Sequence, residues 1–511
     1  AIPLELWEVR HRVERLCDAL GTLPDAFVHV ANPMMPKGEG TTAEAHRGLS
    51  LYSGLYRVLS GAWWRQTTDW QENWAHPSLY GGRRNKDIVA LVWAAQAEIE
   101  KARTLGTPLC GALLDYTKFF DLFDHEFIFN LLEKMGFPKK RATQLRYLYG
   151  HRSLYMNIGR HYGSRWDGCN GLGQGCSQSI LAANAYVSTL FWYLQCTYPD
   201  IMLGAFIDDR NLRHTNVDVL LEALKKIVEF DTAAGHSTNL TKSSVWAINE
   251  ADRKRLAAAE INGQKLECLQ EATLVGHTLS TMMAAGKHLQ NARMDKAVTR
   301  ADRIRALLVS MAVKARLVAT SVIPMILCGT QWTWPSQTLI RRLRAATVRA
   351  MFGNRRKQRC PEIVTGVLNE PHAVDPAGAI LYTTFAAARR VLSNSADLVN
   401  SFIDVFIASA HKKPNAEPGP INGMKQAADA LGLKMQMDDH GRFFFTGPLI
   451  IGKWYFLEGD SRQWKIELKR LVQRAILYQL AERANTTEEN KQSRPRKDMQ
   501  GITPFLVNFG T

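Results

Sequence analysis

Three aspartates in two stretches of the sequence have the side chains and spacing for metal chemistry. Asp208 and Asp209 follow the apolar run 201–207, which predicts a β-hairpin with both acids at its tip. Asp115 ends a second apolar run, 109–114, which predicts another strand. Adjacent carboxylates repel each other and favour a divalent cation between them and a third acid, an arrangement that suits two-metal nucleotidyl transfer. An isolated Asp-Asp pair is more often a plain hairpin turn, so the neighbouring sequence must decide.

Two further residues fit the same chemistry. Phe120 lies five residues after Asp115, where a bulky ring beside the nucleotide would exclude a ribose 2′-hydroxyl. Lys242 lies just before a predicted strand, 245–248, and could neutralise or protonate a leaving pyrophosphate. Each has an ordinary alternative, a core aromatic residue and a surface lysine.

A glycine-rich segment, Gly171–Ser179, precedes a long predicted helix. Its Gly-x-Gly-x-Gly spacing is a weak dinucleotide-loop signal, because the last glycine position and a clear preceding parallel strand are missing. We expect Gln174 and Gly175 instead to pack under a base or sugar.

Four cations lie near glycines, where backbone and charge can both approach a phosphate. They are Lys37, Arg47, Arg83 and Arg84. Solvated surface charges are the alternative for each.

Helical and strand patterns surround these residues. The sequence predicts helices over 5–20, 87–102 and 217–230, a hairpin over 153–168 and a buried helix from about residue 180. From residue 287 the pattern changes to long basic helices, which suit sequence-independent contact with a duplex backbone. The candidate contacts there are Arg341, Arg342, Arg355, Arg356 and Lys357.

Composition limits the classes of protein. The 511 residues predict two or three domains, and a net charge of +16 points to a polyanionic partner, nucleic acid before membrane. Eight scattered cysteines predict a reducing compartment without disulfides or a zinc knuckle. The longest apolar segment, 180–196, contains polar residues and predicts a buried helix instead of a membrane span. No signal peptide is evident, and the missing initiator Met predicts a fragment or processed piece of a longer chain.

The C-terminal part carries no catalytic pattern. We expect a linker over 401–423, an appendage of unassigned role over 424–511 and a disordered tail over 485–497. Acids that could serve a nuclease are a disfavoured alternative. They are Asp438, Asp439, Glu458 and Asp460.

Taken together, these stretches resemble the reverse transcriptases of non-LTR (LINE-type) retrotransposons from about Pro36 to residue 385. The matching motifs, in the family's order, are Pro36-Lys37 with Arg47–Ser50, Asp115–Asp121, Gly171–Ser179, Phe206-Ile-Asp-Asp209, Asn239–Lys242, Leu274–Gly276 and the thumb-like segment Ile323–Arg359. Gly48 and Gly173 depart from the family, which usually has proline there.

The resemblance implies an α+β right-hand polymerase, with fingers and an antiparallel-sheet palm over 1–285 and a helical thumb and post-thumb over 286–400. It implies two Mg²⁺ ions, or Mn²⁺, held by Asp115, Asp208 and Asp209 with the Tyr116 carbonyl as an extra ligand. Phe120 would be the steric gate and Gly276 part of the primer grip.

The implied partners are an RNA template, a DNA primer or RNA–DNA heteroduplex, and dNTPs. No membrane is involved, and the endonuclease would be encoded elsewhere in the same element. The protein would be intracellular and act in the nucleus.

Two other readings remain. A non-catalytic, reverse-transcriptase-like RNA-binding scaffold or maturase would often lack one of the three acids, yet all three are present. An RNA-directed RNA polymerase is disfavoured by Phe120 and Ile207, where that class usually has an acid and a glycine. Hydrolases and dehydrogenases are disfavoured because no Ser-His-Asp elbow, phosphate-loop lysine or zinc pattern occurs.

Overall fold

The computed structural model describes residues 3–37, 42, 45–159, 161–281, 287–353, 361–366, 369–410 and 417–489. The chain divides into two compact units. The first contains residues 1–91 and 109–269, and the second contains 92–108 and the chain from 270 onward. Each unit is considered by itself.

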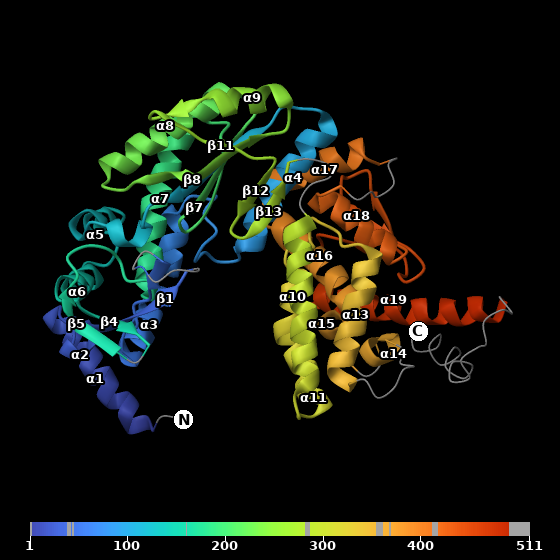
Figure 1. Cartoon of the computed structure of the whole chain (residues 1–511), viewed down its shortest axis with the longest axis horizontal. Coiled ribbons are helices and arrows are strands. Elements are labelled where there is room, and N and C mark those ends of the chain that lie inside the picture. The colour runs from blue at the N-terminus through green and yellow to red at the C-terminus, as the bar shows by residue number, and fades with distance from the viewer. Residues whose placement is uncertain are drawn as a thin grey trace. The chain divides into compact units, whose positions relative to one another are not determined.

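The palm of the first unit is a five-stranded sheet in the order β11-β8-β3-β7-β6. Its strands are β3 (Cys110–Tyr116), β6 (Met202–Phe206), β7 (Asp209–His214), β8 (Thr238–Ala247) and β11 (Glu267–Cys268). All neighbours are antiparallel except β11 and β8. The helices α8 (Val217–Ala233) and α9 (Glu250–Ala258) pack along this sheet (Figure 1). The predicted antiparallel palm is therefore present.

The central strand β3 is apolar because it is covered on both faces. Six of its seven residues are buried, and only Asp115 is partly exposed. A Cβ atom at Gly111 would lie 2.5 Å from the Trp246 ring of β8, so glycine is needed there for the tryptophan to cross the strand.

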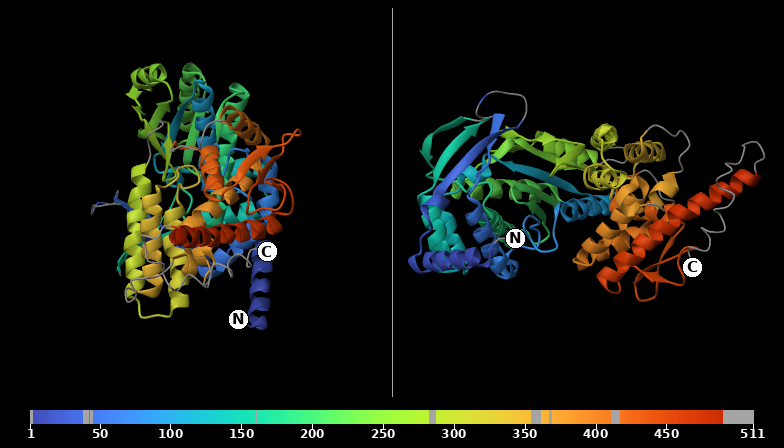
Figure 2. Two further views of the ribbon diagram at one scale, coloured as in Figure 1. Left: turned by 90° about the vertical axis from the view of Figure 1, so that its right-hand side faces the viewer. Right: turned by 90° about the horizontal axis from the view of Figure 1, so that it is seen from below.

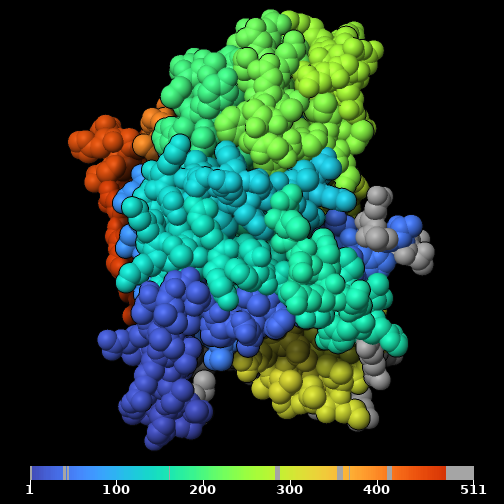
Figure 3. Space-filling view, turned by 90° about the vertical axis from the view of Figure 1, so that its left-hand side faces the viewer, coloured from blue at the N-terminus to red at the C-terminus, as the bar shows by residue number. Residues whose placement is uncertain are grey.

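The fingers contain a second sheet in the order β2-β1-β4-β5. Its strands are β1 (His29–Pro36), β2 (His46–Gly48), β4 (Ser153–Ile158) and β5 (His161–Asp167), so the hairpin predicted over 153–168 is present. In the right-hand view of Figure 2, β1 is the blue arrow beside the blue-green strands. The helix α1 (Leu4–Leu20) extends from this unit, as the dark blue atoms of Figure 3 show. Many of its large apolar side chains are exposed.

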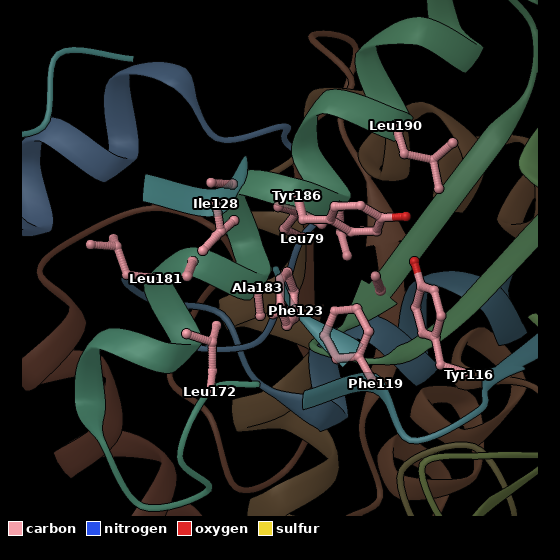
Figure 4. Packing of buried hydrophobic residues seen from close by; sticks show 14 of the residues in the cluster. Leu79, Tyr116, Phe119, Phe123, Ile128, Leu172, Leu181, Ala183, Tyr186 and Leu190 are labelled. Atoms are coloured by element: carbon pink, nitrogen blue, oxygen red, sulfur yellow. The ribbon is translucent and has the colours of Figure 1, made fainter. Parts of the chain in front are cut away.

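Helices surround the sheets of the first unit. They are α2 (Asp25–Val28), α3 (Gly54–Trp74), α5 (His125–Lys134), α6 (Lys139–Gly150) and α7 (Ser177–Thr197), with a short 3-10 turn at Phe119–Leu122. An aromatic core lies beside α7, where Figure 4 shows the rings of Tyr116, Phe119, Phe123 and Tyr186 close together. The small strands β9 (Glu260–Ile261) and β10 (Gln264–Lys265) form a separate hairpin.

The second unit is mainly helical. Within it α10 (Lys287–Ala306) and α13 (Gln337–Phe352) lie side by side (Figure 1). Around them are α11 (Met311–Leu317), the π-helical turn Val318–Val322, α12 (Ile323–Leu327), α14 (Pro361–Gly366), α15 (Pro371–Val374) and α16 (Pro376–Leu392). The hairpin of β12 (Glu271–Leu274) and β13 (His277–Ser280) also belongs to this unit.

The helix α4 (Ile88–Leu105) is shared by the two units. Its residues up to 91 belong to the first unit, and those from 92 onward belong to the second. Its buried polar side chains explain the assignment. Gln96 exchanges hydrogen bonds with the backbone of Ser280, and the Glu100 carboxylate accepts the N–H groups of Ile421 and Asn422. The predicted division between palm and thumb at residue 285 follows the order of the chain, so it does not include these contacts of residues 96 and 100 with residues beyond 269.

The C-terminal segment packs on the thumb helices. The helices α17 (Ala396–Ala408), α18 (Pro420–Ala430) and α19 (Ser461–Glu489) contact α16 or one another, with the three-stranded sheet β14 (Lys434–Met437), β15 (Phe443–Thr446) and β16 (Trp454–Tyr455) beside them.

Two predictions for this segment differ from the structure. Residues 401–408, predicted as linker, are helical because Phe402 and Val405 are buried. The helix α19 continues to Glu489, although the tail was predicted to begin at 485, and the chain from 490 lies outside the described residues. The disfavoured nuclease acids Asp438 and Glu458 are both paired with Arg442. Among the described residues, no helix combines the length and apolar character needed to cross a membrane.

Candidate active site

The three predicted aspartates lie on adjacent strand ends of the palm. In the register of β3 and β7, Leu114 faces Arg210, so the next facing pair is Asp115 and Asp209. Asp209 also faces Phe206 of β6, which leaves Ile207 and Asp208 as the two-residue turn. The structure therefore places Asp115, Asp208 and Asp209 at neighbouring strand ends of one sheet, and their role as metal ligands stays a prediction.

The turn before Asp208 is conformationally strained. Ile207 has φ +61°, a region that β-branched residues rarely adopt. Such strain costs on the order of 1–3 kcal/mol and persists only where surrounding contacts hold it. The strained residue stands directly before the two consecutive carboxylates.

Burial and the neighbouring carboxylates disfavour the charged forms of Asp208 and Asp209. Burial, the Asp208 carboxylate and the Asp115 carboxylate raise the pKa of Asp209 to about 6. Burial and Asp115 also raise the pKa of Asp208, while its own amide, Arg47 and the Asp209 amide act in the opposite direction. None of the three carboxylates forms an ion pair with any residue that the structure describes. Among the described residues, Arg47 therefore opposes this negative charge from a distance without an ion pair.

The donor set fits a divalent cation. Carboxylate oxygens are the ligands that Mg²⁺ and Mn²⁺ prefer, and the repulsion between these acids is what a bound cation would relieve. In the described part of the chain, no group of three or more His, Cys, Asp or Glu residues is already arranged around a metal position. The acids supply the donor chemistry without being gathered into a closed site.

A turn at residues 79–82 supports the Asp-Asp hairpin from the side. Tyr80 N–H donates to Ala205 O at 2.8 Å, and Ala205 N–H donates to Ser78 O at 3.0 Å. A Cβ atom at Gly81 would lie 2.6 Å from Ile207 Cγ1, and Asn184 of α7 binds the Gly81 carbonyl. The glycine-arginine turn that was predicted to bind nucleic acid is thus a buttress of the hairpin.

This role corrects the prediction for Arg83. Its guanidinium forms two hydrogen bonds with the Glu72 carboxylate and a third with His76 O, and its side chain is only 5% exposed. With three of its five N–H donors bound and so little of its side chain exposed, Arg83 has little surface left for a phosphate. Arg84 pairs with Asp69 at the surface and remains exposed.

The glycine-rich loop docks on the fingers. Ser50 N–H donates to Gln174 O at 2.9 Å, and a Cβ atom at Gly175 would lie 2.3 Å from Ser50 O. Gly173 donates its N–H to Tyr149, and a Cβ atom there would lie 2.1 Å from the Tyr52 hydroxyl. The loop therefore needs glycine at 173, which explains the departure from the family's proline.

Phe120 contacts the same loop, and the fingers cations act on nearby acids. Phe120 is partly buried against the aromatic core, and its carbonyl accepts Leu172 N–H at 2.7 Å. Burial raises the pKa of Asp208, Asp209 and Asp121, and the exposed Arg47 of β2 partly offsets each rise, joined by Lys37 at Asp121. The structure thus places Arg47 within electrostatic reach of the acids.

Lys242 lies in an irregular part of β8. The pairing of β3 with β8 shifts register between Leu113 and Asp115, and Lys242 is exposed in the displaced segment. Its N–H donates to the side chain of Asn239, the residue that faces Asp115. The lysine is near the acids along the strand, and its role as a general acid stays a prediction.

The remaining predicted contacts belong to the second unit. Gly276 forms, with Val275, a two-residue turn in which both residues have positive φ, and its carbonyl accepts a hydrogen bond from Arg293. Arg341 is exposed on α13, and Arg342 pairs with Asp295. Arg355, Arg356 and Lys357 lie outside the described residues.

Sequence reasoning missed a buried ion pair behind the acids. Arg210 and Asp231 are both fully buried, and their side chains are 2.9 Å apart. The available signal was an arginine inside a strand that should be apolar, directly after Asp209. Its partner, at the end of an amphipathic helix, could not be identified from the sequence alone.

Comparisons with known proteins agree with this geometry. Residues 35–279 match the family model for reverse transcriptase (RNA-dependent DNA polymerase). No curated protein matches the chain.

Telomerases are among the solved structures that are similar to this chain. Apo telomerase of Candida tropicalis without its C-terminal domain is 14% identical, with 50% of this chain and 54% of that chain covered and a TM-score of 0.35. The apo telomerase of the same organism is 13% identical, with 78% and 69% covered and a TM-score of 0.41. Candida albicans telomerase, solved with a fragment of telomeric RNA, is 11% identical, with 80% and 67% covered and a TM-score of 0.37.

The chain spans little more than half the length of the first of these structures. The sheet order, the helical second unit and the family match confirm the predicted α+β right-hand polymerase fold. Residues 35–279 of this chain match a reverse transcriptase domain.

Proposed function

We propose that the chain is an RNA-directed DNA polymerase of the non-LTR retrotransposon type, which extends a primer 3′-hydroxyl with dNTPs. The observation that supports the proposal is the pairing of Leu114 with Arg210, the neighbours of Asp115 and Asp209 on adjacent strands, with Asp208 in the turn between β6 and β7. The type of element rests on the order of the sequence motifs, which resembles that family.

Asp115, Asp208 and Asp209 would hold the divalent ions, with the Tyr116 carbonyl as an additional ligand. Bound there, Mg²⁺ would make the primer hydroxyl a better nucleophile and offset the charge of the triphosphate. Arg47 and Lys37 would neutralise the phosphates, and Lys242 would give a proton to the leaving pyrophosphate. Gln174 and Gly175 would hold the base or sugar, and the Phe120 ring would exclude a 2′-hydroxyl.

The test is primer extension on an RNA template with Mg²⁺, comparing dNTPs with rNTPs. Asp208→Asn and Asp209→Asn should each abolish extension, because they keep the shape of the side chain and remove its charge. Asp200→Asn is the matched control, since Asp200 is an exposed aspartate of the same unit. Extension that survives in Asp208→Asn would refute the proposal.

The second candidate is a non-catalytic RNA-binding scaffold or maturase, favoured only by the basic surface and net charge of +16. It predicts tight, salt-sensitive RNA binding without extension, unchanged by Asp208→Asn. The same set of variants therefore separates the two functions.

A further inference from the structure

The side chains next to the acids point to the opposite face of the palm sheet. Successive residues of a strand alternate between faces. Tyr116 follows Asp115 on β3, and Arg210 follows Asp209 on β7. The face behind the acids therefore carries Tyr116 and Arg210, which are both buried.

These two side chains are in direct contact and are tied to three more elements. The guanidinium carbon of Arg210 lies 3.6 Å from the centre of the Tyr116 ring. Its Nη1 donates to Asp231 of α8 at 2.9 Å, and its Nη2 donates to Thr238 of β8 at 3.3 Å. The remaining Asp231 oxygen accepts the hydroxyl of Tyr186 from α7 at 2.8 Å.

We propose that Arg210 is a positioning residue, which fixes the strand ends that carry Asp115 and Asp209 by clamping Tyr116, Asp231 and Thr238 behind them. The proposal rests on the proposed function, because it concerns the same acids. It names a role for side chains that do not touch substrate.

Stability alone does not explain this arrangement. Arg210 and Asp231 are 0% exposed, and a buried ion pair is often no more stabilising than an apolar pair of the same volume. What the ion pair adds is a fixed geometry of its hydrogen bonds. A planar guanidinium has fixed donor positions, so it sets the distance and angle between β3, β7 and β8 in a way that an apolar side chain cannot.

The Arg210 charge lies directly beside that of Asp231. Burial opposes the charge of Arg210, but Asp231 and Tyr116 favour it, so that its pKa is raised and the guanidinium stays charged. Asp231 offsets this charge locally.

The test compares Arg210→Met, Arg210→Lys and the double variant Arg210→Met/Asp231→Leu with the wild type. Arg255→Met is the matched control, since it breaks an exposed ion pair with Asp218 in the same unit. Three quantities are measured in the whole chain: the midpoint of thermal unfolding, Mn²⁺ affinity by electron paramagnetic resonance without nucleic acid, and kcat and KM for dNTP in primer extension.

We expect Arg210→Met to lose stability, Mn²⁺ affinity and kcat, with the last two falling by about 10- to 100-fold. The double variant should recover the midpoint of unfolding, because no unpaired charge remains, but neither Mn²⁺ affinity nor kcat. Arg210→Lys should lie between, because it keeps the charge without the planar fork. KM for dNTP should change little, and Arg255→Met should resemble the wild type.

A double variant that regains wild-type Mn²⁺ affinity along with its unfolding midpoint would overturn the proposal and leave the pair a structural one. The proposal would also be overturned if the wild type bound no Mn²⁺, or if its Mn²⁺ affinity were unchanged by Asp208→Asn. If the wild type binds Mn²⁺ through Asp208 but does not extend a primer, the proposed function fails, and the Mn²⁺ affinities of the variants still decide the role of Arg210.

Discussion

Gly81 lies directly against Ile207, so that a Cβ atom at Gly81 would be 2.6 Å from Ile207 Cγ1 and 3.0 Å from its amide nitrogen. Ile207 in turn has φ +61° and precedes Asp208. The strained residue that precedes the acids is thus in close contact with a glycine more than one hundred residues earlier in the chain.

Gly81→Ala should therefore displace the hairpin. We expect a loss of about 1–3 kcal/mol in the free energy of unfolding, because the added methyl group meets both a side chain and backbone. The loss of extension activity should be greater than the loss of stability alone explains, since the displaced residues include Asp208. Denaturant unfolding and primer extension measure the two effects.

Gly61→Ala is the control for this substitution. Gly61 lies inside α3, and a Cβ atom there would meet nothing within 4 Å. It should stabilise the protein by about 0.5–1 kcal/mol, because alanine favours helix, and leave extension unchanged. Equal behaviour of the two variants would contradict the buttress role of Gly81.

The raised pKa of Asp209 predicts how stability depends on pH. In the folded protein this pKa is about 6, above the value of about 3.9 in an unfolded chain, so the folded state holds the proton more tightly. Its contribution to the free energy of unfolding is therefore fully present below about pH 4 and lost as the pH rises through about 6. Allowing for solvent screening at this partly exposed group, the loss is about 1–2 kcal/mol.

Asp209→Asn should remove this dependence. The variant should be more stable than the wild type at pH 8 and no more stable at pH 4, although it is inactive. Mg²⁺ should raise the unfolding midpoint of the wild type at pH 8 and should do so much less in Asp209→Asn. Thermal unfolding at the two pH values, with and without Mg²⁺, checks both statements, and a pH-independent difference would contradict them.

Phe120 is expected to select the sugar. Phe120→Val should raise rNTP incorporation relative to dNTP incorporation by about 10- to 100-fold, since a shape difference of this size is worth about 1–3 kcal/mol. Single-nucleotide extension with each substrate gives the ratio. Phe127→Val is the control, since Phe127 is an exposed phenylalanine on α5, and a similar ratio in both variants would count against the gate.

Gly173→Pro should destabilise the protein even though proline is the residue that the resemblance leads one to expect. The substitution removes the N–H that donates to Tyr149 and places ring atoms against the Tyr52 hydroxyl, 2.1 Å from the Cβ position. We expect a loss of about 3 kcal/mol. Chemical unfolding measures it.

Combining Gly173→Ala with Tyr52→Phe separates the two causes. Tyr52→Phe removes the hydroxyl that the new methyl group would meet, so the double variant should be more stable than Gly173→Ala alone. Additive effects of the two substitutions would show that the contact between these positions does not matter.

The sequence alone determined which acids of the chain are candidates for binding a metal ion. Apolar runs that end in Asp115 and in Asp208-Asp209 can hardly form anything but buried strands with acids at their ends, because the runs must be covered and the carboxylates must not be. The hairpin over 153–168, the helix beginning near Val217 and the helical second half follow from periodicity in the same way.

Only the tertiary structure decided which charges are engaged and which are free. Arg83 and Arg84 are neighbours of one type in the sequence, yet Arg83 is enclosed by Glu72 and the His76 carbonyl while Arg84 stays exposed. Arg210 and Asp231 meet across twenty-one positions of the chain to form a buried pair. The unit boundary likewise depends on Glu100 capping a helix that begins at Pro420. Such partners are set by long-range packing, which local pattern and propensity do not encode.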